Sequence, residues 1–239
     1  MDYSGLSLNK STFEERQKNL SYIRVLYILL ALELVLAVIW ASFCLYFWNK
    51  LGEPIVRWWE FGLAAAIICV LLILACLFVR ALRKNPINWA VYGVFTLSFA
   101  HLCAFLACWD STRLFYYALW ILTAVTVALA IYAVINSYYT DNITAMVLVF
   151  GAGAIVLAWF VAFSNMPVFQ LILVYVPVAI FGLYLAYNLR KTVRNSLFDH
   201  SEEDPVSGAV RIWIESVLVV CRLGELIGKM FTSTSHLPR

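Results

Sequence analysis

Seven long apolar stretches divide this chain, and they constrain its fold more than any other feature. Each is close to the ~20 residues that an α-helix needs to cross the hydrocarbon core of a bilayer. In lipid, every backbone N–H and C=O group must find its partner within the protein, and a helix provides those partners along its own length. The predicted membrane spans are residues 25–48, 58–79, 87–108, 114–135, 143–164, 167–187 and 206–228.

The composition is typical of a membrane protein rather than of a soluble globular protein. Of 239 residues, 64% are hydrophobic and only 13% are charged, which leaves too much apolar surface for a soluble protein to bury. The segments between the spans are short, residues 165–166 being the briefest, so they leave no room for a soluble domain. The sequence therefore predicts an all-α membrane protein, a seven-transmembrane helical bundle that forms a single domain.

The expected boundaries of this bundle are residues 25 and 228. Residues 1–24 form a polar N-terminal tail, and residues 229–239 form a C-terminal tail. The seventh stretch carries charges, so it either spans the bilayer fully or enters it and returns.

Small residues within the spans point to close helix packing. Gly151 and Gly153 suit a close approach of two helices, because a glycine lets backbones come together. The cysteines lie within or at the ends of apolar stretches and are interpreted as small packing residues rather than as disulfides or metal ligands. They are Cys44, Cys69, Cys76, Cys103, Cys108 and Cys221.

The seventh stretch carries a stripe of charged residues. At about 100° per residue, all five members fall within an arc of about 80° on one helix face. Charges inside a bilayer are costly, so they usually face a bundle interior or a water-filled path and mark ion or proton handling. Alternatively, Arg211 pairs with Glu215 at i, i+4 and Arg222 pairs with Glu225 at i, i+3, so that each pair is neutral. The side chain of Lys229 then extends to the membrane interface. The stripe consists of Arg211, Glu215, Arg222, Glu225 and Lys229.

Two further polar residues lie deep within predicted spans. Glu33 is about eight residues into the first span, too deep to reach the interface easily, and Arg211 or Arg222 is its expected partner. His101 lies midway along the third span, where a histidine either hydrogen-bonds to a neighbouring helix or titrates in a pathway.

No pattern in the chain predicts an enzyme. His101 and scattered serines do not supply a nucleophile with a base, and neither a phosphate-binding loop nor zinc-ligand spacing occurs. We therefore expect no catalytic residues, no cofactor and no metal site. The net charge of +3 is a topology signal and does not indicate nucleic-acid binding. The lipid bilayer is the expected partner, with calcium or other cations and other membrane proteins as candidates.

Short segments of the chain follow one another at the spacing of a known family. They are IRVLY (23–27), ALEL (31–34), NW (88–89), FTLSFAHL (95–102), TAVTVAL (123–129), LAYN (185–188), SEE (201–203) and GAV (208–210). In this order they resemble the transmembrane Bax-inhibitor-motif family, which includes the Lifeguard and Golgi anti-apoptotic proteins. The resemblance extends over nearly the whole chain.

This resemblance implies seven helices around a central polar site, and calcium leak from internal stores linked to protection from cell death. The family's site has an acid at the end of the sixth helix and another inside the seventh, which match Asn188 and Glu215 here. Asn188 is neutral, and Arg211 stands four residues before Glu215. Calcium requires several oxygen ligands, usually including carboxylates, and this chain has only one of the two acids. The resemblance therefore supports the helical architecture more than it supports calcium binding. The implied ion path or gate is Asn188, Glu215, Arg211 and Glu33, with His101, Arg222 and Glu225 as secondary polar candidates.

Two functions follow from the resemblance and stay open at this stage. One is modulation of ion homeostasis, calcium in particular, and of cell death through the polar site between the sixth and seventh helices. The other is a non-conducting membrane adaptor, viral or cellular, that binds and redirects other membrane proteins. Diverged relatives occur in large DNA viruses, including a cytomegalovirus seven-helix group, and the altered acid pair suits such a copy. Internal membranes such as the endoplasmic reticulum or Golgi are favoured over the plasma membrane.

The distribution of basic residues predicts a cytosolic N-terminus and, with seven spans, a C-terminus across the membrane. Protease digestion of sealed vesicles should therefore remove a tag at the N-terminus and spare one at the C-terminus. Cleavage of both tags from the cytosolic side would contradict the topology and would favour a re-entrant last segment. The basic residues on the cytosolic side are Lys10, Arg16, Lys18, Arg24, Arg80, Arg83, Lys84, Arg190, Lys191 and Arg194.

Overall fold

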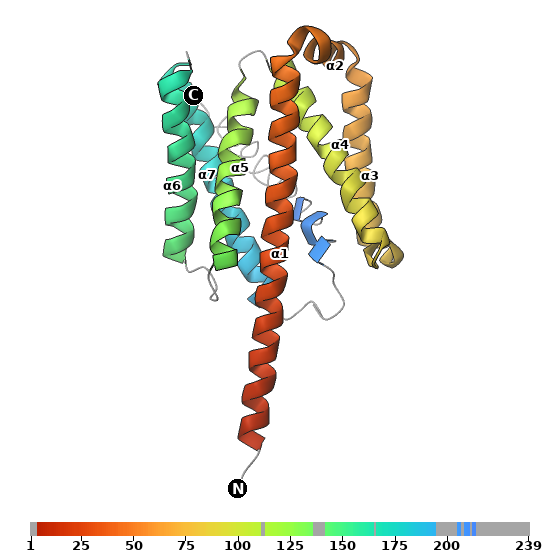
Figure 1. Cartoon of the computed structure of the whole chain (residues 1–239), viewed down its shortest axis with the longest axis vertical. Helices are drawn as coiled ribbons and strands as arrows, with labels where there is room; N and C mark the ends of the chain where they lie inside the picture. The colour runs from red at the N-terminus through yellow and green to blue at the C-terminus, as the bar shows by residue number, and fades with distance from the viewer. Residues whose placement is uncertain are drawn as a thin grey trace, which may run out of the picture.

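Helices form every regular element in the part of the chain that the structure, a computed structural model, describes (Figure 1). The described residues are 4–110, 113–135, 142–164, 166–194, 205–206, 208–210 and 212–213, with the backbone alone for 4–20, 49, 77, 80, 83, 142 and 188–194. The main elements are α1 (Ser4–Tyr46), the π-helical turn η1 (Trp48–Gly52), α2 (Glu53–Arg57), α3 (Trp59–Phe78), the 3-10 turn η2 (Arg80–Arg83), α4 (Ile87–Trp109), α5 (Leu114–Ile135), α6 (Asn142–Phe163) and α7 (Val168–Arg194).

Six helices are long and apolar enough to cross a bilayer, and they confirm the first six predicted spans. The fourth predicted span and α5 have identical bounds, and the third differs from α4 by a single residue. Most of the predicted seventh span lies outside the described residues. Its described residues 206, 208–210 and 212–213 are helical, as is residue 205 just before it, and together they form the C-terminal segment.

The first helix is much longer than its apolar stretch. α1 begins at Ser4, so residues assigned to a polar tail continue the first membrane helix as its N-terminal extension (Figure 1). Neither glycine nor proline occurs between Gly5 and Gly52, so nothing in the sequence interrupts the helix at the boundary between polar and apolar residues. Hydropathy marks the membrane-spanning part of a helix but does not mark where the helix itself begins.

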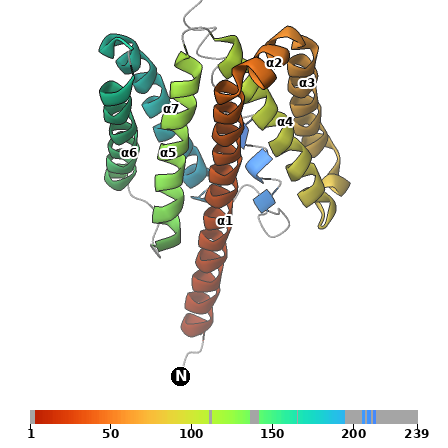
Figure 2. The ribbon, with the colours of Figure 1, turned by 45° about the horizontal axis from the view of Figure 1, so that its top comes forward.

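α1 lies at the centre of the bundle. It packs against α4 on one side and α5 on the other, while α3 packs on α4. α6 and α7 pack on α5 and on each other, so these two helices and α3 lie at opposite ends of the arrangement (Figure 2). The C-terminal segment lies beside α1, where its buried side chains join the same apolar cluster as those of α1.

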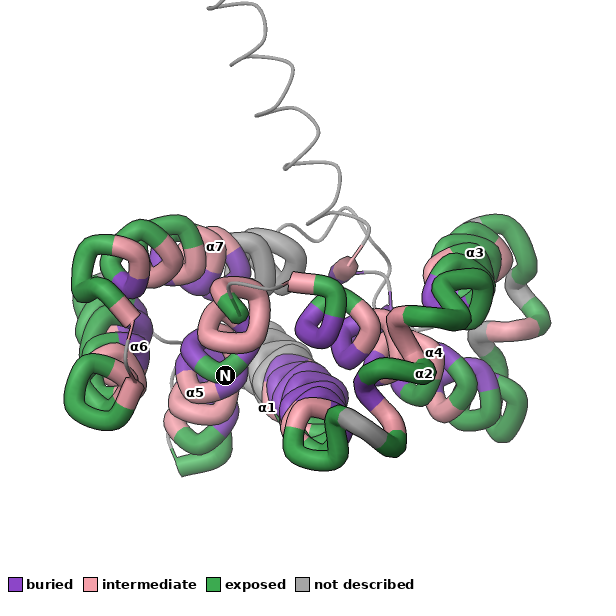
Figure 3. The backbone as a smooth tube through the Cα atoms, turned by 90° about the horizontal axis from the view of Figure 1, so that it is seen from above, coloured by how far each residue is buried: buried purple, intermediate pink, exposed green. Residues whose placement is uncertain are grey.

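Burial follows this arrangement. Along α1, Leu26, Leu30 and Leu34 are almost fully buried, whereas Ile28 and Leu32 on the same helix are exposed. The outer helices α3 and α6 are largely exposed along their length (Figure 3). Because the exposed residues are themselves apolar, the outer surface suits contact with lipid. The hydrophobic effect therefore does not decide which side of a helix faces the bundle interior, and side-chain packing decides it instead.

Small side chains line the contact between α1 and α4. Ala37 and Ala41 on α1, and Ala104 and Ala107 on α4, expose none of their surface and belong to one cluster. This agrees with the rule that small residues let membrane helices approach closely. The cysteines in the described residues are buried, as expected for packing residues: Cys44, Cys69, Cys76, Cys103 and Cys108.

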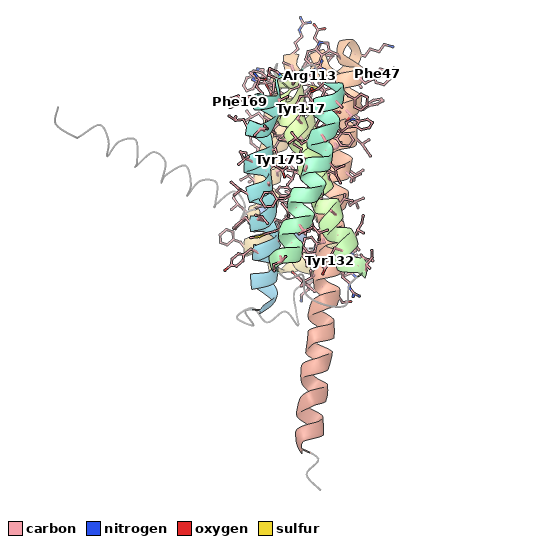
Figure 4. The ribbon with its side chains drawn as sticks, turned by 90° about the vertical axis from the view of Figure 1, so that its left-hand side faces the viewer. Phe47, Arg113, Tyr117, Tyr132, Phe169 and Tyr175 are labelled. Atoms are coloured by element: carbon pink, nitrogen blue, oxygen red, sulfur yellow. The ribbon has the colours of Figure 1, made fainter. Side chains whose placement is uncertain are left out.

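Only one of the two glycines predicted to serve close packing does so. A Cβ atom at Gly153 would lie 2.8 Å from Cε2 of Tyr175 on α7, whereas a Cβ at Gly151 would meet no atom within 4 Å. The Tyr175 hydroxyl donates a hydrogen bond of 2.9 Å to the Phe150 carbonyl oxygen on α6 (Figure 4). The prediction for Gly151 was wrong, because its side of α6 faces away from the neighbouring helices.

Gly153→Ala should therefore destabilise the bundle relative to Gly151→Ala. The new methyl group forces the Tyr175 ring to move and strains its hydrogen bond, and overpacking of this kind costs about 1–3 kcal/mol. The matched variant adds the same methyl group to the same helix in open space. Thermal melts in detergent measure the difference, and equal melting temperatures for the two variants would contradict the contact.

Candidate functional site

Glu33 is the one acidic or basic residue whose side chain is fully buried among the described residues. It lies on the inner face of α1, one helical turn from the buried Leu30 and next to Leu34. Its Oε2 atom accepts a hydrogen bond of 2.7 Å from the Trp213 indole Nε1. Its Oε1 atom is buried and makes no hydrogen bond with any described residue.

Trp213 brings the C-terminal segment to this carboxyl group. Its ring packs against Phe99 on α4, with centroids 4.7 Å apart, so the indole contacts α4 while its N–H group reaches α1. Earlier in the segment, Gly208 lies against Tyr22 and Leu26 of α1 without room for a Cβ atom. The segment is therefore held against α1 at two levels, by a close glycine contact and by the Glu33–Trp213 hydrogen bond.

A small apolar cavity lies beside Glu33. It is formed where α1, α5, α7 and the C-terminal segment meet, and no polar side chain lines it. Apolar walls of this kind stabilise no ion. The lining residues are Leu30, Leu34, Leu122, Phe181, Leu185, Ile212 and Trp213.

The hydroxyl groups of this region are already used within the bundle. Tyr92 donates a hydrogen bond of 2.8 Å to the Leu29 carbonyl oxygen, which ties α4 to α1 one turn before Glu33. Thr123 and Thr126 of α5 donate to backbone carbonyl oxygens of their own helix at 2.7 and 2.8 Å. Among the described residues, no group of three or more His, Cys, Asp or Glu side chains is arranged so that it could hold a metal ion.

The structure describes only part of the site predicted from the sequence. Glu33 is central, as its depth in the first span suggested, but its observed partner is Trp213. His101 is half-buried midway along α4, and its ring makes no hydrogen bond with a described residue. Asn188 is described by its backbone alone, within α7. Arg211, Glu215, Arg222 and Glu225 lie outside the described residues, so the charge stripe and an arginine partner for Glu33 stay predictions.

Trp213 and Arg24 make polar contacts that were not predicted from the sequence. Trp213 was counted among the apolar residues of the seventh stretch, although a buried indole N–H group usually requires an acceptor. Arg24 was interpreted as a topology signal, and its Nε atom also donates a hydrogen bond of 2.9 Å to the Ala133 carbonyl oxygen near the end of α5. A basic side chain at a helix C-terminus satisfies carbonyl groups that lack a partner within the helix.

These features define a multi-pass helical membrane protein whose centre holds a buried carboxyl group. Residues 19–231 match the family described as Inhibitor of apoptosis-promoting Bax1. The chain belongs to this Bax inhibitor-1 family, which confirms the resemblance seen in the sequence. Comparisons with curated proteins and with solved structures gave no significant match.

Trp213→Phe should destabilise the protein, because it removes the hydrogen-bond donor of the buried Glu33 carboxyl group. Leaving a buried polar group unpaired costs about 1–3 kcal/mol. Glu33→Leu combined with Trp213→Phe should cost less than the sum of the two single changes, with a coupling of about 0.5–3 kcal/mol. Trp59→Phe, at an exposed position on α3, is the matched control for loss of an indole group. Additive effects in a denaturation series would show that the two side chains are not coupled.

Proposed function

We propose that this protein modulates the ion balance of an internal membrane, calcium in particular, and through it cell death. The site is the polar centre between the sixth and seventh membrane helices, together with Glu33 of α1. The observation that carries the proposal is the complete burial of Glu33 with one oxygen that lacks a described partner. An ionisable group held at this depth is costly, and such groups usually serve ion or proton handling.

The residues at the family's acidic positions limit which ion this centre can pass well. Asn188 is neutral, and Arg211 stands one helical turn before Glu215 in the sequence. Calcium prefers six to eight oxygen ligands, usually with carboxylates among them. A centre with one family acid offset by an arginine favours weak calcium passage, so the proposed activity is a slow leak with little calcium selectivity.

The same neutral Asn188 favours a second candidate function. A protein that keeps the scaffold but loses the second acid suits a non-conducting adaptor, which binds other membrane proteins and redirects them. An adaptor requires the bundle but no ion path, so the two functions differ in whether the purified protein moves any ion. In both functions the protein acts as a multi-pass protein of internal membranes with its N-terminus in the cytosol.

Flux through the purified protein in liposomes tests the proposal, with calcium compared with monovalent cations. The native protein should pass calcium weakly, and Asn188→Asp combined with Arg211→Asn should raise calcium flux severalfold because it restores two acids to one site. Flux through the restored protein should also depend on pH, since two close acids titrate in separate steps.

The control for this experiment is Asn188→Gln combined with Arg211→Asn, which removes the arginine without adding an acid. It should not raise calcium flux. Glu33→Leu, which removes the polar group, should lower the monovalent flux of the native chain, whereas Glu60→Leu at an exposed position of α3 should leave it unchanged. Strong calcium flux from the native protein would contradict the predicted weak calcium passage, and the absence of flux for every cation would favour the adaptor.

A further inference from the structure

The Glu33 carboxyl group is buried but only half satisfied. Oε2 accepts the Trp213 indole hydrogen bond, while Oε1 has no hydrogen-bond partner among the described residues. A carboxylate has about four acceptor positions, so one donor leaves most of its capacity unused. An ionised carboxylate without further partners in an apolar interior is far more costly than a neutral group in the same place.

No described side chain neutralises this group. Among the described residues, the titratable groups near it are Cys69 on α3, and Tyr92 and Cys103 on α4. A thiol and a phenol carry no positive charge in either protonation state, so they cannot balance a carboxylate. On α1 itself, the Arg24 Nε atom is bonded to the Ala133 carbonyl oxygen, more than two helical turns from Glu33.

A metal cation fits this place poorly. Calcium takes about six to eight oxygen ligands, and magnesium requires near-octahedral coordination. The adjoining cavity is lined by apolar side chains, and the nearby Tyr92 hydroxyl already donates to the Leu29 carbonyl oxygen. A single carboxyl group with one indole donor offers too few oxygen ligands for either ion. A proton, by contrast, needs only one carboxyl oxygen.

We propose that Glu33 is a proton-binding site at the centre of the bundle, with the proton on Oε1 and the Trp213 indole bonded to Oε2. In this state Oε2 is a carbonyl oxygen that accepts the N–H group, and the carboxyl group carries no charge. Loss of the proton places a negative charge between α1 and the C-terminal segment. Because this site uses neither Asn188 nor Glu215, it is distinct from the family's acidic pair and does not depend on ion flux.

Infrared difference spectroscopy on the full-length protein in lipid bilayers tests this site. At neutral pH, the spectrum of the native protein minus that of Glu33→Gln should contain the C=O stretching band of one protonated carboxyl group. The difference between the native protein and Glu60→Gln should contain carboxylate bands instead, because Glu60 is exposed. Carboxylate bands in the Glu33 difference would overturn the proposal and would favour an arginine partner such as Arg211 or Arg222.

A second variant keeps the test decisive if Glu33→Gln does not fold. In Trp213→Phe the Glu33 carbonyl oxygen loses its donor, so the protonated-carboxyl band should move to higher frequency. Exchange from H2O to D2O should also shift this band, since the proton on Oε1 is exchangeable. A protonated-carboxyl band that is absent, or that does not move in Trp213→Phe, would overturn the assignment to Glu33.

Discussion

The close packing of small side chains between α1 and α4 is the interaction on which the rest of the bundle depends. Lipid tails are as apolar as the helix surfaces, so exclusion from solvent does not drive helices together. Ala37 and Ala41 share one buried cluster with Ala104 and Ala107, and none of the four has exposed surface. α1 packs between α4 and α5. The outer helices then pack on α4 or α5, and the inner face of α1 is shielded from lipid.

Because α1 is central, the Glu33 carboxyl group is buried within the protein. On an outer helix such as α3, a glutamate could turn toward lipid headgroups or water, whereas on the inner face of α1 the carboxyl group must find its partner within the protein. The observed partner comes from Trp213, 180 residues later in the chain. This polar contact thus links the first helix to the last described segment.

The sequence predicted the helices better than it predicted their contacts. Six predicted spans agree with the structure, because the hydropathy and the length of a span depend on one continuous segment and not on its tertiary contacts. The extension of α1 to Ser4 was not predicted, since helix propensity continues where hydropathy ends. For the site, the depth of Glu33 in its span indicated burial. Its bond to Trp213 was missed because the indole was counted as apolar, although its N–H group is a donor.

The sequence by itself determined the solvent, the class of fold, the positions of the six described spans and the presence of a carboxyl group deep in the first. These properties depend on the composition of each segment and on the thickness of a bilayer. Only the tertiary structure decided that α1 is central, that Gly153 rather than Gly151 faces a neighbour, and that Trp213 reaches Glu33. Helices that are apolar on every side carry no local pattern that selects an inner face, so the selection comes from side-chain fit between segments far apart in the chain.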